Sequence, residues 1–395
     1  MTPARKSTLP IYLSAGCIFM ALAVRSFILP LRVDQLGGDK VVVGVLFSVG
    51  TVTGAGLSLP AGFLADRVGK RALLIGAIVV GGISQLGLGL AGSVPPLFPW
   101  QAVAGMGAAG AQAALMSALV DIVPRSRLGR AMGWLTLAFQ LGFLAGPAAA
   151  GVALQWLSLQ EVLTAATALF GVALVLAAVG VRAGRGTGAG WNIAGPLREI
   201  ARRRAFLVAA AAMLGATVVW GTLQAYLPLF GKEHLRLPET QIGYMIAIQA
   251  VANGLARIPG GLLVDRVRRR GLLVIGGLAA YSVSLALLPH LDGFWPATAL
   301  LALTVPILAT VYLALGVVFG DLSTPETRGV AMGVYGTILY LGLGFGPAAF
   351  GPVIERGGYV VGFTACAVAG VALAVAAAAL QSERLRPRRG EAAAA

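Results

Sequence analysis

The chain has 395 residues, of which 58% are hydrophobic and only 11% are charged, and its formal net charge is +15. Because a soluble domain is typically about 25% charged, this composition excludes a soluble globular protein and indicates a polytopic membrane protein. The basic excess would suit a nucleic-acid-binding protein only if it formed one surface, but it is divided among short connections between apolar runs, which argues against that class.

The apolar runs recur along the whole chain, and each is close to the ~20 residues with which an α-helix crosses the hydrocarbon core. Helices are expected because each one satisfies its own backbone hydrogen bonds in lipid. In chain order, the sequence predicts twelve spans, at residues 9–30, 41–64, 72–92, 96–119, 130–154, 162–181, 205–230, 241–263, 271–289, 296–319, 329–353 and 359–380. The first is expected to be a retained span, since it lacks the short apolar core and cleavage site of a signal peptide.

Charge along the chain predicts the orientation of these spans. Most of the 30 basic residues fall in the connections on one side, and the opposite side holds only Arg32, Lys40, Lys232, Arg236 and Arg356. By the positive-inside rule, both termini are then cytoplasmic. Cys17 and Cys366 fall inside spans and no CxxC or histidine cluster occurs, so neither a metal nor a cofactor is expected.

The chain contains an internal duplication. GFLADRV at 62–68 is repeated as GLLVDRV at 261–267, and GPAAAG at 146–151 is repeated as GPAAFG at 346–351. We therefore expect two parallel six-helix halves. Secondary transporters that are built from two such repeats have their substrate site between them, and the same place is expected here. The predicted boundaries are an N-terminal half at 1–181, a cytoplasmic linker at 182–204, a C-terminal half at 205–380 and a cytoplasmic tail at 381–395.

GFLADRVGKR at 62–71 resembles the signature that the major facilitator superfamily carries between spans 2 and 3, and GLLVDRVRRR at 261–270 is similar to its weaker second copy. Two copies at matching places extend the resemblance over essentially the whole chain. It implies an all-α membrane fold of twelve transmembrane helices in two pseudo-symmetric halves. It also implies gating roles in these loops, for Gly62, Asp66, Arg67, Gly69, Lys70, Arg71, Asp265 and Arg266.

In this family the first aspartate faces the N-terminus of span 11, which here begins near Arg328 or Gly329, and unpaired N–H groups there favour an anion. Asp66 would then be a cytoplasmic latch that closes when the site faces outward and opens when it faces inward. Asp265 would repeat the contact with span 5, near Arg130. The alternative is that Asp66 only neutralises part of a basic loop at the membrane edge.

Gly146 and Pro147 lie in a stretch that resembles the span 5 signature of the family's antiporters, although Ala150 replaces one of its glycines. The proline and its small neighbours would allow span 5 to bend and pack closely, and they are gating candidates. The alternative is plain helix packing, because GPAAFG repeats the pattern in span 11.

Arg25 and Arg257 are cations inside spans. An arginine there costs about 2.5–3.5 kcal/mol on insertion scales, so Arg25 is a candidate for binding a negative group of the substrate. Its alternatives are a structural pair with Asp34 or Glu161, or extension to the outer interface. Arg257 lies eight residues before Asp265, about 12 Å along the helix, and a gate or packing role is favoured for it.

No Asp or Glu lies in the middle of a predicted span; Asp34 and Glu161, at span ends, are the candidates for proton coupling. Gln101 stands where the antiporters' span 4 signature has arginine, so both features depart from standard proton–drug exchange. The resemblance places spans 1, 4, 7 and 10, with faces of 2, 5, 8 and 11, around a central cavity. Its candidate substrate-binding residues are Arg25, Gln112, Gln140, Trp220, Gln224, Tyr226, Gln249, Asn253, Tyr312, Tyr335 and Tyr340.

The leading interpretation is a secondary active transporter that works by alternating access and exports an amphipathic or drug-like compound in exchange for protons. The alternative is uptake of a small anionic metabolite that binds Arg25. A polytopic membrane enzyme or receptor is a remote alternative, since His234 and His290 lie alone in outer loops. We expect a monomer in the cytoplasmic membrane, with a small-molecule substrate and the lipid bilayer as its partners.

Overall fold

The computed structural model describes residues 8–124, 127–181, 203–267, 270–323 and 328–382, together with Gly195 and Arg198. These residues form helices and connections, without a strand among them. The predicted linker, apart from those two residues and 203–204, and the predicted tail beyond 382 lie outside this description.

The helices of the first half are as follows: α1 (Leu9–Gln35), α2 (Lys40–Val68), α3 (Lys70–Leu90), α4 (Leu97–Ile122), α5 (Leu128–Ala153), α6 (Leu159–Ala165) and α7 (Thr167–Gly180). Those of the second half are α9 (Arg204–Leu229), continued by the π-helical turn η2 (Phe230–His234), α10 (Glu239–Arg266), α11 (Arg270–Leu287), continued by the 3₁₀ turn η3 (Leu288–His290), α12 (Phe294–Asp321) and α13 (Arg328–Ser382). α6 and α7 together form one span, Leu159–Gly180.

Eleven stretches of these described residues are long and apolar enough to cross a membrane, and the last one contains two spans. α13 has 55 residues, which at 1.5 Å each is about 80 Å, far more than the ~30 Å of a hydrocarbon core. Its backbone leaves the helical conformation at Gly358, where φ is 74° and ψ is −180°. A residue with a side chain rarely adopts that φ, so glycine makes the reversal possible. The predicted twelve-helix architecture is confirmed.

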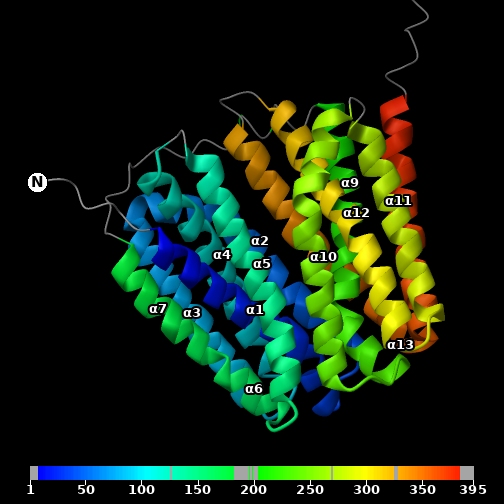
Figure 1. The fold of residues 1–395 in the computed structure, drawn as a ribbon, viewed down its shortest axis with the longest axis horizontal. Coiled ribbons are helices and arrows are strands. Elements are labelled where there is room, and N and C mark those ends of the chain that lie inside the picture. The colour runs from blue at the N-terminus through cyan, green and yellow to red at the C-terminus, as the bar shows by residue number, and fades with distance from the viewer. Residues whose placement is uncertain are drawn as a thin grey trace, which may run out of the picture.

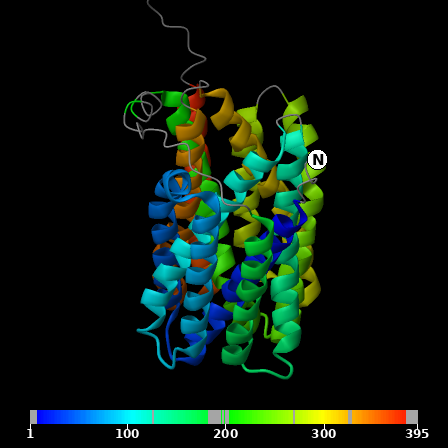
Figure 2. The ribbon, with the colours of Figure 1, turned by 90° about the vertical axis from the view of Figure 1, so that its left-hand side faces the viewer.

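The helices run along a common direction in two halves that lie side by side, α1–α7 and α9–α13 (Figures 1 and 2). We call the end of the bundle where α1 begins the Leu9 end, and the opposite end, which contains the turns at 36–39, 154–158, 235–238 and Gly358, the Lys40 end. The halves meet mainly through α2 against α13 and α5 against α10.

Two of the basic residues of the first loop signature bind carbonyls within their own half. Lys70 Nζ donates to Ser117 O at 3.3 Å, and Arg71 Nη2 donates to Ala178 O at 2.8 Å. Ala178 lies in the last turn of α7, where carbonyls have no partner inside the helix, so Arg71 caps that helix. Gly69 forms the turn between α2 and α3 at φ 91°, a conformation that favours glycine.

Candidate transport site

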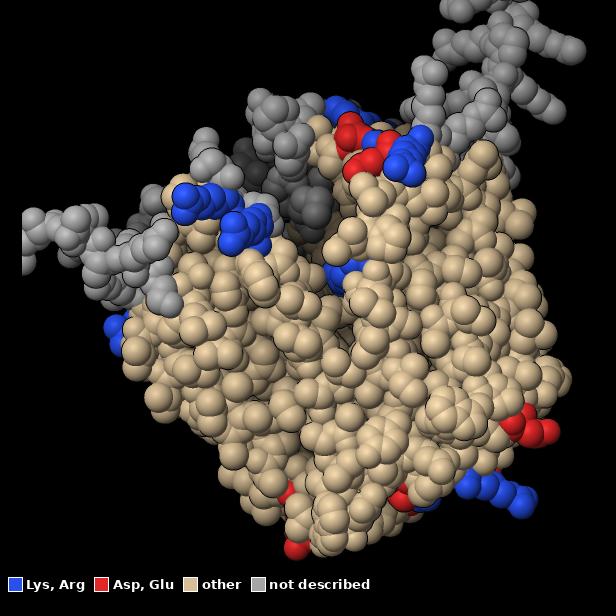
Figure 3. Space-filling view, in the orientation of Figure 1, with Lys and Arg blue, Asp and Glu red and all other residues tan. Residues whose placement is uncertain are grey.

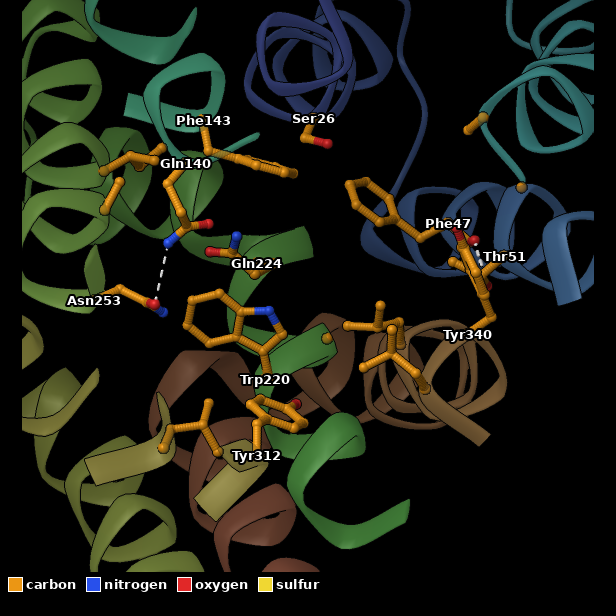
Figure 4. Close-up of a pocket in the computed structure, with 18 of the residues that line it drawn as sticks. Ser26, Phe47, Thr51, Gln140, Phe143, Trp220, Gln224, Asn253, Tyr312 and Tyr340 are labelled. Carbon is orange, nitrogen blue, oxygen red and sulfur yellow. Dashed lines mark hydrogen bonds between the residues drawn. The ribbon is translucent and has the colours of Figure 1, made fainter. Parts of the chain in front are cut away.

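A cavity of about 530 Å³ lies between the two halves. It is lined by α1, α2, α4 and α5 of the first half and by α9, α10, α12 and α13 of the second, the eight spans that the sequence analysis expects there. Its volume is within the range of small-molecule sites, roughly 300–1,000 Å³. Figure 4 shows side chains from both halves around this space.

Most of the predicted substrate-binding residues line this cavity, and two hydrogen bonds that they form join the halves. The predicted residues that line it are Arg25, Gln140, Trp220, Gln224, Gln249, Asn253, Tyr312, Tyr335 and Tyr340. Gln140 Nε2 donates to Asn253 Oδ1 at 3.1 Å across the halves, as Figure 4 shows. Gln112 lies beyond the lining, but its side-chain oxygen accepts a hydrogen bond from Tyr340 OH at 2.7 Å, which also crosses the halves.

Tyr226 does not line the cavity, so that expectation is not met. It is fully buried, and its hydroxyl lies 2.7 Å from Lys40 O and 2.9 Å from Pro347 O. Tyr226 comes two residues after Gln224, which is about 200° of rotation around the helix, and therefore lies on the opposite face. Its contacts are structural and hold α9 against α2 and α13.

The structure adds Ser26, Phe47, Thr51, Gln101 and Phe143 to the lining. These residues could have been found from the sequence by their spacing along each helix. Cavity-lining positions on α10 recur as 246, 249, 250, 253 and 257, and those on α4 as 101, 105 and 108. Positions three, four and seven apart share one face of a helix, so a polar or small stripe with this period marks the inner face.

Arg25 is buried, with 8% of its surface exposed, and it lines the cavity. Both partners proposed for it from the sequence are engaged elsewhere. Asp34 pairs with Lys232 at 2.8 Å, and Glu161 forms a capping box with Ser158 at the start of α6. In this structure Arg25 pairs with neither acid, and its side chain is buried at the cavity.

The cavity is closed toward the Lys40 end by ion pairs between the halves. Lys40 Nζ of α2 lies 3.1 Å from Glu233 Oε2 and 3.7 Å from Glu355 Oε2, and Asp34 of α1 pairs with Lys232. Tyr359 OH donates to Glu233 at 3.0 Å. Partly exposed ion pairs contribute about 0–1 kcal/mol each, so this cluster adds specificity to a closure that close packing also maintains.

The close packing between the halves at this end occurs twice, at equivalent positions of the two sequence repeats. A Cβ added to Gly44 of α2 would overlap the carbonyl oxygen of Pro347 in α13, and one added to Gly243 of α10 would overlap that of Pro147 in α5. Gly146 instead faces α1, where its Cβ would lie 2.8 Å from Met20 O. Pro147 is thus at the contact between the halves, while Gly146 packs within one half.

Toward the Leu9 end the halves separate. Cβ atoms added at Gly133 of α5, Gly254 of α10 and Gly336 of α13 would meet no atom within 4 Å, and Asp265 and Arg266 are exposed. Figure 3 shows the surface hollowed between the halves on this side. Arg257, at the cavity lining, is also exposed. The side chains of Gly62 and Asp66 lie outside the part of the chain that the structure describes.

Comparison with known protein families identifies this architecture. The family model described as Major Facilitator Superfamily matches residues 11–313 and 232–395. The chain belongs to this superfamily.

Related members agree with this assignment. The Putative uncharacterized MFS-type transporter MT0872 of Mycobacterium tuberculosis strain CDC 1551 is 28% identical over 351 residues, which cover 83% of this chain and 82% of the relative. The Putative multidrug resistance protein MdtD of Escherichia coli O81 strain ED1a is 33% identical over 131 residues, covering 33% of this chain and 28% of the relative.

Solved structures share the fold. The nucleoside transporter NupG superposes with a TM-score of 0.82 at 14% identity, over 94% of this chain and 99% of that one. A bacterial homolog of the human lysosomal transporter Spinster, in an inward-facing and unoccupied conformation, superposes with a TM-score of 0.76 at 18% identity, over 96% of each chain. This superfamily member is therefore a multi-pass membrane transporter of small molecules, and its family and fold are not in general those of enzymes.

Proposed function

We propose that this transporter exports an amphipathic organic solute from the cytoplasm by alternating access, in exchange for protons. One observation carries the proposal: a cavity between two duplicated halves that is closed at the Lys40 end and open at the Leu9 end. Aromatic rings and uncharged amides such as those of Trp220, Tyr312 and Gln224 suit an amphipathic solute. The partial similarity to a relative named as a multidrug resistance protein supports export.

The positive-inside rule orients the transporter in the membrane. The Leu9 end contains the basic connections, such as the turn with Arg67, Lys70 and Arg71, so we place it and both termini in the cytoplasm. The conformation described is then inward-facing. We place the transporter in the cytoplasmic membrane as a monomer, since the cavity is complete within one chain.

Inverted membrane vesicles from a bacterial expression host test the direction. A panel of ring compounds, each prepared as carboxylate, carboxamide and aminomethyl forms, is offered outside the vesicles. We expect accumulation when the vesicle interior is acidic, and its loss on adding a protonophore. Accumulation driven only by an acidic exterior would instead favour uptake, the alternative that Arg25 supports through its positive charge. Failure of every compound under both gradients would overturn the proposal.

Asp34 is the proposed coupling residue. Its pair with Lys232 joins the two halves, so opening of the Lys40 end must separate the two groups and leave a carboxylate free to take up a proton from outside. Asp34→Asn is expected to reduce gradient-driven accumulation about tenfold or more while leaving exchange of labelled for unlabelled substrate in place. Asp39→Asn is the matched control, because the Asp39 carboxylate accepts from Val42 N at the start of α2. Equal losses in both variants would exclude this role.

The latch proposed for Asp66 predicts a change of rate without a loss of folding. Asp66→Asn should favour the inward-facing conformation, because the contact with span 11 is made only when the Leu9 end closes. We expect transport to fall roughly tenfold, because a loss of about 1.4 kcal/mol in the stability of the conformation closed at the Leu9 end lowers its population about tenfold. Normal transport by this variant in inverted vesicles, at unchanged protein level, would contradict the latch.

A further inference from the structure

Of the nine buried side-chain polar atoms that lack a hydrogen-bond partner among the described residues, four belong to side chains that line the cavity. Among the described residues, Arg25 Nη1, Gln101 Oε1, Gln249 Nε2 and Tyr312 OH are buried without a hydrogen-bond partner, and all four side chains line the cavity. Buried polar groups in native proteins are nearly always bonded. All four side chains line one cavity, and a solute bound in that cavity can supply the partners that the protein does not.

The charge of the lining specifies the sign of that ligand. Among the described lining residues, Arg25 and Arg257 are the charged ones, and neither Asp nor Glu occurs with them. Arg257 is exposed and reaches water at the open end, whereas Arg25 is 8% exposed. A buried charge without a counter-ion is strongly disfavoured, so the bound solute has to bring one negative charge to Arg25.

The hydrogen-bonding groups favour the same solute. A guanidinium presents parallel N–H donors that match a carboxylate, and such charge-assisted bonds are about twice as strong as neutral ones. Gln249 contributes a second unpartnered donor, and Tyr312 OH can also donate. Donors exceed acceptors at the site, which favours a ligand rich in acceptor oxygens.

The rest of the lining is aromatic. Figure 4 shows Phe47 and Tyr340 on one side of the space, and Phe143, Trp220 and Tyr312 on the other. Aromatic side chains that surround a cavity stack on rings of a ligand in offset or edge-on arrangements. The solute therefore has an apolar body, with at least one ring, attached to its anionic group.

We propose that the transported solute is an amphipathic organic monoanion whose carboxylate binds Arg25 and whose ring system lies among Phe47, Phe143 and Trp220. This inference rests on the proposed function and names the substrate class of the same site. It separates this transporter from exporters of cationic drugs, because Arg25 repels a cation in the cavity and neither Asp nor Glu is among the described lining residues.

Binding to the purified full-length protein in detergent micelles tests the inference. The probes are matched triplets on naphthalene, biphenyl and indole, each as carboxylate, carboxamide and aminomethyl forms, titrated calorimetrically at pH 7. The carboxylates are expected to bind at least about tenfold more tightly than the carboxamides, as one charge-assisted hydrogen bond predicts. Arg25→Gln should weaken carboxylate binding far more than carboxamide binding and so remove this preference, and Arg25→Lys should retain part of it.

Arg32→Gln is the matched control. Arg32 lies on the same helix and is 7% exposed, but it is not among the cavity lining residues; its Nη2 donates to Ala91 O and to Gln160 Oε1, both at 3.1 Å, although its Nε has no partner. The preference for carboxylates should survive this change. Because Arg25 Nη1 lacks a partner, Arg25→Gln is also expected to leave the melting temperature unchanged or raised.

The results that overturn the inference differ from those that overturn the proposed function. Equal binding of the three forms, tighter binding of the amines, no binding of any carboxylate, or a preference that survives Arg25→Gln would each exclude an anion at Arg25. If inverted vesicles still accumulate neutral or cationic compounds, transport of amphipathic solutes stands without this inference. If they accumulate none of the compounds, the proposed function fails.

Discussion

Replacing Gly44 and Gly243 together by leucine is expected to open the Lys40 end of the transporter and to slow transport. Gly44 lies against the carbonyl oxygen of Pro347, and Gly243 lies against that of Pro147, each in the opposite half. The helices are so close at both contacts that a side chain on the glycine would overlap the carbonyl. Overpacking typically costs 1–3 kcal/mol at each site, or about 2–6 kcal/mol for both. Inverting a two-state population from 99:1 to 1:99 takes about 5.5 kcal/mol, which lies near the upper end of this range, so the two substitutions together shift the equilibrium strongly toward opening.

Distances between spin labels at positions 156 and 295 measure this opening. Trp156 and Trp295 are 75% and 73% exposed at the Lys40 end, one in each half, so cysteines there can be labelled once Cys17 and Cys366 are replaced. The label distance should lengthen, and transport should fall about tenfold or more because the conformation that is closed at the Lys40 end is depopulated.

Gly56→Leu and Gly254→Leu together are the control for the distance measurement. These glycines lie on the same two helices, and a Cβ at either would meet nothing within 4 Å. The control should leave the label distance unchanged. An unchanged distance in the Gly44 and Gly243 variant would show that these contacts do not hold the Lys40 end closed.

The duplication explains why the sequence predicts so much of the fold. Span lengths near the membrane thickness define the helices, and repeats such as GPAAAG and GPAAFG relate the two halves. Gly44 and Gly243 also occupy equivalent positions in the two repeats, but the sequence does not show that each meets the proline of the opposite repeat. That contact depends on how the halves associate, which neither repeat encodes by itself.

The sequence predicts a site residue correctly where the spacing of residues along a helix shows which of them share the inner face. Trp220 and Gln224 are four residues apart and share the inner face, whereas Tyr226 is on the opposite face. The pair of Asp34 with Lys232 joins residues that are 198 positions apart. Periodicity carries no information about such a partner, so the closure of the Lys40 end could not be predicted from the sequence.

Gly105→Leu tests the same steric overlap inside one half. It should destabilise the protein instead of opening the Lys40 end. A Cβ at Gly105 of α4 would overlap the Gly50 carbonyl oxygen and Thr53 Oγ1 of α2, and Thr53 Oγ1 also donates to Ala102 O at 3.0 Å. Both helices belong to the N-terminal half, so if that half moves as one body, as the proposed alternating access requires, a change of conformation cannot relieve the overlap. The variant should lose stability without any lengthening of the label distance between positions 156 and 295.

For an overpacking cost near 3 kcal/mol, the melting temperature in detergent should fall by about 6–12 °C, since 1 kcal/mol corresponds to roughly 2–4 °C in a domain of this size. Gly56→Leu is the matched control on α2, where nothing lies within 4 Å of the added Cβ, and should melt close to the unchanged protein. If Gly105→Leu instead kept its melting temperature and lengthened the label distance, α2 and α4 would have to move apart during transport, and the rigid six-helix half would be the wrong unit of motion.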